Sequence, residues 1–146
     1  MILKQLSVFL ENLPGTLSRP CRILADAGIN ILTIALADTQ QYGILRVVVH
    51  EWEKARQVLE KNGCAVKVND VVAVEVPDRP GGLAEVLEVI EGAHINVEYM
   101  YAFTAKSEGK GIMLFRFDKP ELAIARLQAG KLNPVSTADL FKRLAK

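Results

Sequence analysis

The sequence predicts an α+β fold of two βαββαβ units, each with an antiparallel sheet and two helices on one face. Two observations support this prediction. A motif occurs twice, 66 residues apart, and the apolar residues around both copies change from strand spacing to helix spacing. The motif comprises Asn12-Leu13-Pro14-Gly15-Thr16-Leu17 with Asn30-Ile31, and Asp78-Arg79-Pro80-Gly81-Gly82-Leu83 with Asn96-Val97.

The motif stands between a strand and a helix in both copies. Apolar residues alternate with other residues over 6–10 and 72–76, which is typical of a strand with one buried face. After each Pro-Gly step, apolar residues at helical spacing over 17–24 and 83–90 predict amphipathic helices.

Each copy continues with two strands, a second helix and a closing strand. The strands are predicted at 30–37, 44–49 and 64–69, and at 96–103, 112–117 and 132–135. The second helices are predicted around 55–59 and, with Asp118 as N-cap, around 120–127. A terminal helix capped by Ser136 or Thr137 completes the chain.

These elements give two domains, residues 1–69 and 70–146, with Asn69-Asp70 as the only linker. Each domain has the element order of the ferredoxin-like split βαβ arrangement. The uncovered sheet faces carry apolar residues, among them Phe9 and Met100. We therefore expect these faces to pack against another sheet, within the chain or in a dimer.

Charge and composition disfavour several classes of protein. The chain has 146 residues with 18 basic and 17 acidic side chains, so its net charge of +1 gives no electrostatic basis for binding nucleic acid or an anionic membrane. It has no stretch of membrane-span length, no signal-peptide pattern and no paired cysteine motif, so we expect a soluble, cytoplasmic protein. A hydrophobic fraction of 50% favours a homo-oligomer.

The strand–helix loop has the chemistry of an amino-acid site. Its glycine lets the backbone approach a ligand, and the first helix amides lack intrahelical acceptors at the positive end of the dipole, which suits a carboxylate. Asn12, Asp78, Asn30 and Asn96 supply polar groups for an ammonium or a carboxylate. Alternatively, Asn12 and Asp78 only cap helices and Pro-Gly is only a turn. The repetition of the whole pattern favours ligand binding.

On these residues the chain resembles the ACT domain family. The resemblance rests on the Asx-x-Pro-Gly-x-Leu motif at 12–17 and 78–83 and on the asparagines at 30 and 96, and it covers essentially the whole chain as a tandem pair. ACT domains are regulatory modules that bind amino acids or similar metabolites between paired domains, usually to control metabolic enzymes. The resemblance implies that the loops and asparagines line the ligand site, at the junction of two units paired side by side.

The two copies differ within the motif. The differing pairs are Asn12 and Asp78, Thr16 and Gly82, and Gly28 and His94. The second copy also has Arg79, which can pair with a carboxylate. These differences predict that the two sites are unequal.

Two other classes of function are disfavoured. An RNA-recognition module shares this topology, but its stacking positions correspond to Ile112 and Leu114 rather than to aromatic residues. An enzyme is disfavoured because His50 and His94 occupy non-equivalent positions and no catalytic, metal or phosphate-loop pattern is found in the sequence. We therefore expect no catalytic residues, no metal and no cofactor.

The sequence thus predicts a non-catalytic regulatory protein that binds a free amino acid or similar metabolite and forms a homodimer, with a metabolic enzyme as a possible further partner. An alternative within the same class is a regulatory small subunit of a biosynthetic enzyme such as acetolactate synthase.

Overall fold

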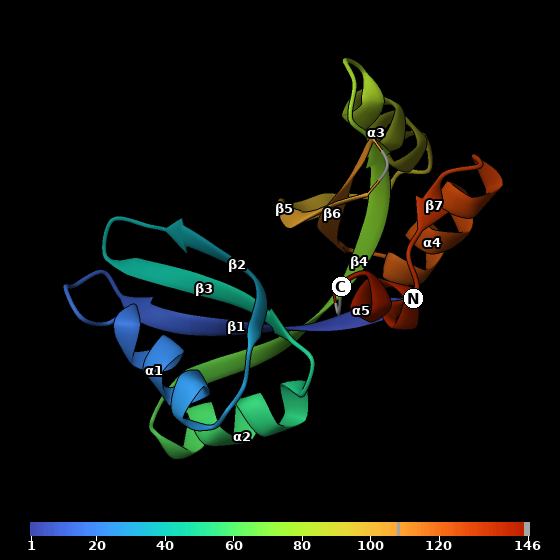
Figure 1. Ribbon diagram of the computed structural model, residues 1–146. Coiled ribbons are helices and arrows are strands. Elements are labelled where there is room, and N and C mark those ends of the chain that lie inside the picture. The colour runs from blue at the N-terminus through green and yellow to red at the C-terminus, as the bar shows by residue number, and fades with distance from the viewer. Residues whose placement is uncertain (108, 145–146) are drawn as a thin grey trace. The chain divides into compact units, whose positions relative to one another are not determined.

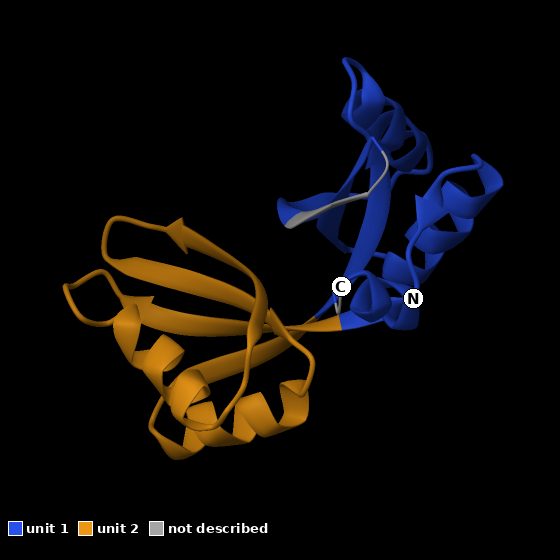
Figure 2. Cartoon of the chain, viewed as in Figure 1, with its two compact units in different colours: residues 1–3, 70–146 blue, residues 4–69 orange. Residues whose placement is uncertain are grey.

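The computed structural model describes residues 1–107 and 109–144, without the side chains of residues 104–107. The chain divides into two compact units (Figure 2). The first unit is formed by residues 4–69, and the second unit by residues 70–146 together with residues 1–3.

The first unit is a four-stranded sheet with two helices (Figure 1). Its elements are β1 (Ile2–Glu11), α1 (Ser18–Asp26), β2 (Ile31–Asp38), β3 (Tyr42–Val49), α2 (Trp52–Lys61) and the beginning of β4 (Ala65–Pro77). The strand order is β2-β3-β1-β4, and β3 pairs antiparallel with both β1 and β2. Tyr42 begins β3, so the turn before that strand ends at Gln41.

The second unit repeats this plan and adds a helix. After β4 come α3 (Gly82–Gly92), β5 (Val97–Ser107), β6 (Lys110–Phe117), α4 (Pro120–Ala129), β7 (Asn133–Pro134) and α5 (Thr137–Leu144). β6 lies between β4 and β5, β7 pairs with β4, and all these pairings are antiparallel. The predicted fold class is confirmed, with two βαββαβ units, antiparallel pairing and a C-terminal helix.

Each unit has its own hydrophobic core between sheet and helices. In the first unit, Leu6 and Val8 of β1 are fully buried and pack with Leu24 of α1 and Leu59 of α2. In the second unit, Val72, Val74 and Val76 of β4 pack with Ile90 of α3 and Leu127 of α4. The alternation over 6–10 and 72–76 therefore predicted the buried face of each first strand correctly.

The chain passes from one unit to the other inside a strand. β4 is a continuous strand of 13 residues, and Asn69 and Asp70 lie in its middle rather than in a loop. The expectation of a linker at these residues is therefore wrong, because the backbone stays in strand conformation through Asn69 and Asp70 although the alternation of polar and apolar residues is interrupted there. At the N-terminus, Ile2 packs against the core of the second unit, and its carbonyl accepts a hydrogen bond from Thr137 Oγ1 at 3.4 Å.

One of the two predicted helix caps is confirmed and the other is wrong. Ser136 caps α5, since its Oγ accepts a hydrogen bond from the backbone N–H of Asp139 at 3.1 Å. Asp118 does not cap α4, whose N-cap is Lys119 and has no side-chain cap. The Asp118 carboxylate instead accepts a hydrogen bond from the backbone N–H of Asn96 at 2.9 Å, and so ties the start of β5 to the end of β6.

The sheet faces away from these helix-lined cores differ between the units. In the first unit, Phe9 on this face of β1 is 47% exposed. Its counterpart in β4 is Glu75, which is only 8% exposed and accepts a hydrogen bond from Arg143 of α5. Since Val74 and Val76 face the core of α3 and α4, α5 lies on the opposite side of β4. Met100 was expected on the uncovered face, but it packs against that same core.

Candidate functional site

Both Pro-Gly steps form the same turn. In the first copy the backbone N–H of Thr16 donates to the carbonyl of Leu13 at 3.3 Å, and the equivalent bond within residues 79–82 is 3.0 Å long. The third residue of each turn is Gly15 or Gly81, with φ of +87° or +86°. This is the geometry of a type II turn, which favours proline at its second position and requires a residue such as glycine at its third. The sequence therefore dictates the loop conformation directly.

Each turn is anchored to the neighbouring β-hairpin. The backbone N–H of Asn12 donates to the carbonyl of Gln41 at 3.1 Å, and that of Asp78 donates to the carbonyl of Gly109 at 3.0 Å. The N-caps of the following helices are Leu17 and Gly81, and neither helix has a side-chain cap. The alternative that Asn12 and Asp78 cap these helices is therefore wrong.

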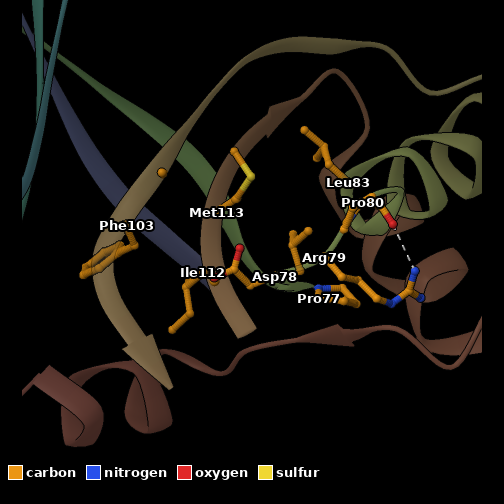
Figure 3. A pocket seen from close by; sticks show the side chains of 11 residues that line it. Pro77, Asp78, Arg79, Pro80, Leu83, Phe103, Ile112 and Met113 are labelled. Atoms are coloured by element: carbon orange, nitrogen blue, oxygen red, sulfur yellow. Dashed lines mark hydrogen bonds between the residues drawn. The ribbon is translucent and has the colours of Figure 1, made fainter. Parts of the chain in front are cut away.

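A cavity lies beside each turn. The second loop pocket has a volume of about 490 Å³ (Figure 3). It is lined by Val76, Pro77, Asp78, Arg79, Pro80, Leu83, Ala102, Phe103, Gly111, Ile112 and Met113. The first loop pocket has a volume of about 380 Å³. It is lined by Leu10, Glu11, Asn12, Leu13, Pro14, Gly15, Thr16, Leu17, Leu36, Asp38 and Gly43. Both volumes lie in the range of small-molecule sites.

The two pockets occupy equivalent places in the two units. Each is bounded by the end of a first strand, the Pro-Gly turn, the start of a helix and a hairpin. The corresponding lining residues are Leu10 and Val76, Leu17 and Leu83, Leu36 and Ala102, and Gly43 and Gly111. The duplication seen in the sequence is therefore also a duplication of a cavity.

The structure brings together most of the loop residues expected in the site. Residues 12–17 all line the first loop pocket, and Asp78, Arg79, Pro80 and Leu83 line the second. Gly81 and Gly82 shape the second turn without lining its pocket.

The asparagine pairs Asn30-Ile31 and Asn96-Val97 lie elsewhere in their own units. Ile31 begins β2, whereas Leu36 and Asp38 at the other end of that strand line the pocket. Six strand residues span about 20 Å, so Asn30 lies far from the loop of its own unit. Ile31 and Val97 pack against the two cores instead. Neither unit alone combines its loop with its own asparagine.

The charged groups of the second loop pocket are Arg79 and Asp78. The Arg79 guanidinium is paired with Glu85, because its Nη2 donates to both carboxylate oxygens of Glu85 at 2.7 and 2.9 Å. Its Nη1 donates to the carbonyl of Pro80 at 3.4 Å, and Figure 3 shows this group pointing away from Met113. Arg79 therefore lines the pocket mainly with its aliphatic stem.

The second copy has Gly82 at the position where the first copy has Thr16, and the structure explains this difference. The Thr16 hydroxyl lies 2.6 Å from the carbonyl oxygen of Glu11 and 2.8 Å from that of Leu13, and α1 begins two residues later, at Ser18. In the second copy α3 begins directly at Gly82, where a Cβ would lie 2.1 Å from the carbonyl oxygen of Pro77. Only glycine fits this tighter junction.

Another difference between the copies lies away from the pockets. Gly28 and His94 occupy equivalent positions just after α1 and α3, and both have positive φ, at +70° and +57°. Neither residue lines a loop pocket. This difference therefore affects the C-terminal end of each helix rather than a loop pocket.

Within the described part of the chain, no group of three or more His, Cys, Asp or Glu side chains is arranged to hold a metal, and no helix is long and apolar enough to cross a membrane.

Sequence reasoning missed the hairpin residues that complete each pocket. Leu36 and Asp38 end β2, and Ala102 and Met113 stand in β5 and β6. A signal was present, because in a βαβ unit the second strand runs parallel to the first and ends beside the loop. Applying the repeat spacing to this end of the strands would have identified them.

Comparisons with known proteins agree with this geometry. Residues 1–144 match the family described as an ACT domain pair. The solved structure of protein BT0572 from Bacteroides thetaiotaomicron is 34% identical, with a TM-score of 0.88 and 97% of each chain covered. The ligand-free regulatory subunit of aspartate kinase from Thermus thermophilus is 18% identical, with a TM-score of 0.63, 87% of this chain covered and 91% of that chain. The comparison with curated proteins found no match.

Proposed function

Because this chain belongs to the ACT domain pair family, we propose that it is a non-catalytic regulatory protein that binds a free amino acid or similar small metabolite at its Pro-Gly loops. The observation that carries this proposal is the pair of equivalent cavities beside two identical turns. Each cavity adjoins a helix start without a side-chain cap. The N–H groups of Thr16 and Gly82 are bonded within the turns, so the backbone amides that follow them, at Leu17 and Leu83, are the ones that suit a ligand carboxylate. The side-chain oxygens of Asn12 and Asp78 suit an ammonium group.

The placement of the asparagines supports a site shared between paired ACT domains. Asn30 and Asn96 stand at the strand ends remote from their own loops. If Asn30 or Asn96 lies beside a Pro-Gly loop, that loop belongs to a different ACT domain, in this chain or in a second copy. We therefore propose ligand binding at the junction of paired domains and a homodimeric assembly.

A thermal-shift screen against the twenty amino acids tests this function. An amino acid present at a hundredfold excess over its dissociation constant is expected to stabilise the folded chain by about 2.7 kcal/mol. For a chain of this size the unfolding midpoint should rise by roughly 5 °C or more. If none of the twenty raises the midpoint, the proposed binding of a free amino acid is contradicted.

Two matched variants locate the site. Asn12→Ala and Asp78→Ala remove side chains that do not cap a helix, so each variant is expected to fold in the absence of ligand. One or both should reduce the ligand-induced shift, because a lost charge-assisted hydrogen bond costs about 1.5–3 kcal/mol of binding free energy. A full shift in the double variant would contradict the placement of the site at the loops.

A regulatory subunit of a biosynthetic enzyme, such as acetolactate synthase, is the second candidate. The similarity of fold to aspartate kinase regulatory subunits favours this class of partner. Co-expression with the enzyme and measurement of the mass of the purified complex would distinguish it from a free-standing regulator. The same ligand site is expected in both cases.

A further inference from the structure

The walls of the second loop pocket are mainly apolar. Leu83 from α3, Met113 from β6 and Ala102 from β5 lie beside the turn. Ile112 precedes Met113 in β6 and points to the opposite face of that strand, as Figure 3 shows. Side chains of this kind stabilise a bound apolar group by removing it from water, and they offer no hydrogen bond to a polar one.

The positive charge at this pocket is already engaged. Glu85 of α3 accepts two hydrogen bonds from Arg79, so the guanidinium is held by a carboxylate of the same unit. Both side chains of this pair are about half exposed, so the pair is weak, but a second carboxylate on a ligand would have to compete with Glu85 for the guanidinium. Transfer of an unpaired charge from water is strongly unfavourable.

The remaining polar groups suit the α-ammonium and α-carboxylate groups that all amino acids share. Asp78 contributes a carboxylate to the pocket lining, which suits an α-ammonium group. Leu83 lines the pocket in the first turn of α3, where its backbone N–H has no intrahelical acceptor and suits an α-carboxylate. These groups leave the apolar wall for the ligand side chain.

The first loop pocket is electrostatically different. Glu11 and Asp38 line it in addition to Asn12, and none of the described lining residues is a lysine, arginine or histidine. Two carboxylates beside the helix start oppose the binding of a ligand carboxylate. The second loop pocket is therefore the better site for a zwitterion.

We infer that the second loop pocket takes an amino acid with an uncharged, apolar side chain, placed against Leu83, Ala102 and Met113. This inference rests on the proposed function and specifies the class of ligand for that site. It makes the second copy of the motif the higher-affinity sensor.

Calorimetric titration of the full chain tests this ligand class. The probes are leucine, isoleucine, valine, methionine and phenylalanine, compared with alanine, aspartate, glutamate and lysine. The best apolar amino acid is expected to bind at least tenfold more tightly than the three charged ones. If leucine is that ligand, alanine should bind about fiftyfold more weakly, since each buried CH₂ contributes about fourfold in affinity.

Two matched variants assign the side-chain contact to one pocket. Ala102→Lys and Leu36→Lys place a cation at equivalent, exposed strand positions of the second and first pockets. Ala102→Lys should weaken the best apolar ligand at least tenfold, and Leu36→Lys by less than threefold. Circular dichroism melts without ligand are expected to show both variants folded.

The possible results distinguish the inferred ligand class from amino-acid binding itself. A charged amino acid that binds within tenfold of the best apolar one, or equal effects of the two lysine variants, would overturn the inferred ligand class while leaving amino-acid binding in place. Absence of binding by every amino acid would overturn the proposed function as well.

Discussion

Gly82→Ala is expected to lower the free energy of unfolding by about 3 kcal/mol and to disrupt the second loop pocket. A Cβ at this position would lie 2.1 Å from the carbonyl oxygen and 3.0 Å from the carbonyl carbon of Pro77. Both are backbone atoms at the end of β4, which is held by its pairing with Lys110 and Gly111 of β6. The clash therefore requires a shift of the strand or of α3. Urea unfolding followed by circular dichroism measures the loss.

The same helix provides the control. Gly92 is the last residue of α3, and a Cβ there would meet no atom within 4 Å. Gly92→Ala is expected to raise stability by about 0.5–1 kcal/mol, because alanine loses less backbone entropy than glycine on entering a helix. Equal effects of the two substitutions would show that the close approach of Gly82 to Pro77 is not what requires glycine.

Glu75→Gln is expected to lower the free energy of unfolding by about 2 kcal/mol at pH 7. Glu75 is 8% exposed, and its carboxylate accepts hydrogen bonds from Arg143 of α5, from Asn133 at 2.8 Å and from Lys110 at 3.4 Å. The amide of glutamine cannot pair with both cations. Because Lys110 and Arg143 are partly exposed, the loss should fall below the range for fully buried ion pairs.

The pH dependence of this loss follows from the pKa of Glu75. Burial raises the pKa of the carboxyl, but the hydrogen bonds from Asn133 and Arg143 and the charges of Arg143 and Lys110 outweigh burial, so the pKa lies below the ordinary 4.5. A lowered folded-state pKa stabilises the protein above 4.5, and this contribution is lost as the pH falls below that value.

Denaturant unfolding of both proteins between pH 7 and pH 3 measures this contribution. The advantage of the wild type over Glu75→Gln should shrink as the solution is acidified. Glu60→Gln is the control, because the Glu60–Arg56 pair is exposed on α2 and should contribute about 0.5 kcal/mol or less. A wild-type advantage that stays constant between pH 7 and pH 3 would contradict the ion-pair account of how α5 is held.

Local sequence rules predicted the turns and the first strands well. In Pro14-Gly15 and Pro80-Gly81 the proline fixes φ at the second turn position and the glycine permits the positive φ at the third, so these residues favour a type II turn. The alternation at Leu6 and Val8 identified the buried face because a half-buried strand has a period of two.

Contacts between residues far apart in the sequence were harder to predict. Asp118 has the spacing of a helix cap, yet its carboxylate bonds to the backbone of Asn96, because that amide lies next to it in the folded unit. Glu75 lies in an alternating strand, and nothing in its local sequence indicates that Arg143 approaches from a helix 68 residues later.

The candidate site also contains both residues that are adjacent in the sequence and residues that only the fold brings together. The loop residues 12–17 and most of 78–83 could be assigned from the motif, since they are adjacent in sequence and share one turn. Leu36, Ala102 and Met113 lie outside the motif and reach the pockets through strand order, so only the topology of the βαβ unit identifies them. The position of the asparagines at the remote strand ends likewise follows from topology.

A nuclear magnetic resonance titration of the ¹⁵N-labelled full chain tests most directly whether an amino acid binds at the Pro-Gly loops. The ligand is the amino acid that gives the largest thermal shift. We expect the largest chemical-shift changes at the backbone amide of Leu83 and of the adjoining turn residues Gly81 and Gly82, with smaller changes at residues 15–17. Saturable changes confined to residues outside both loops, or no saturable change at all, would contradict binding at the loops.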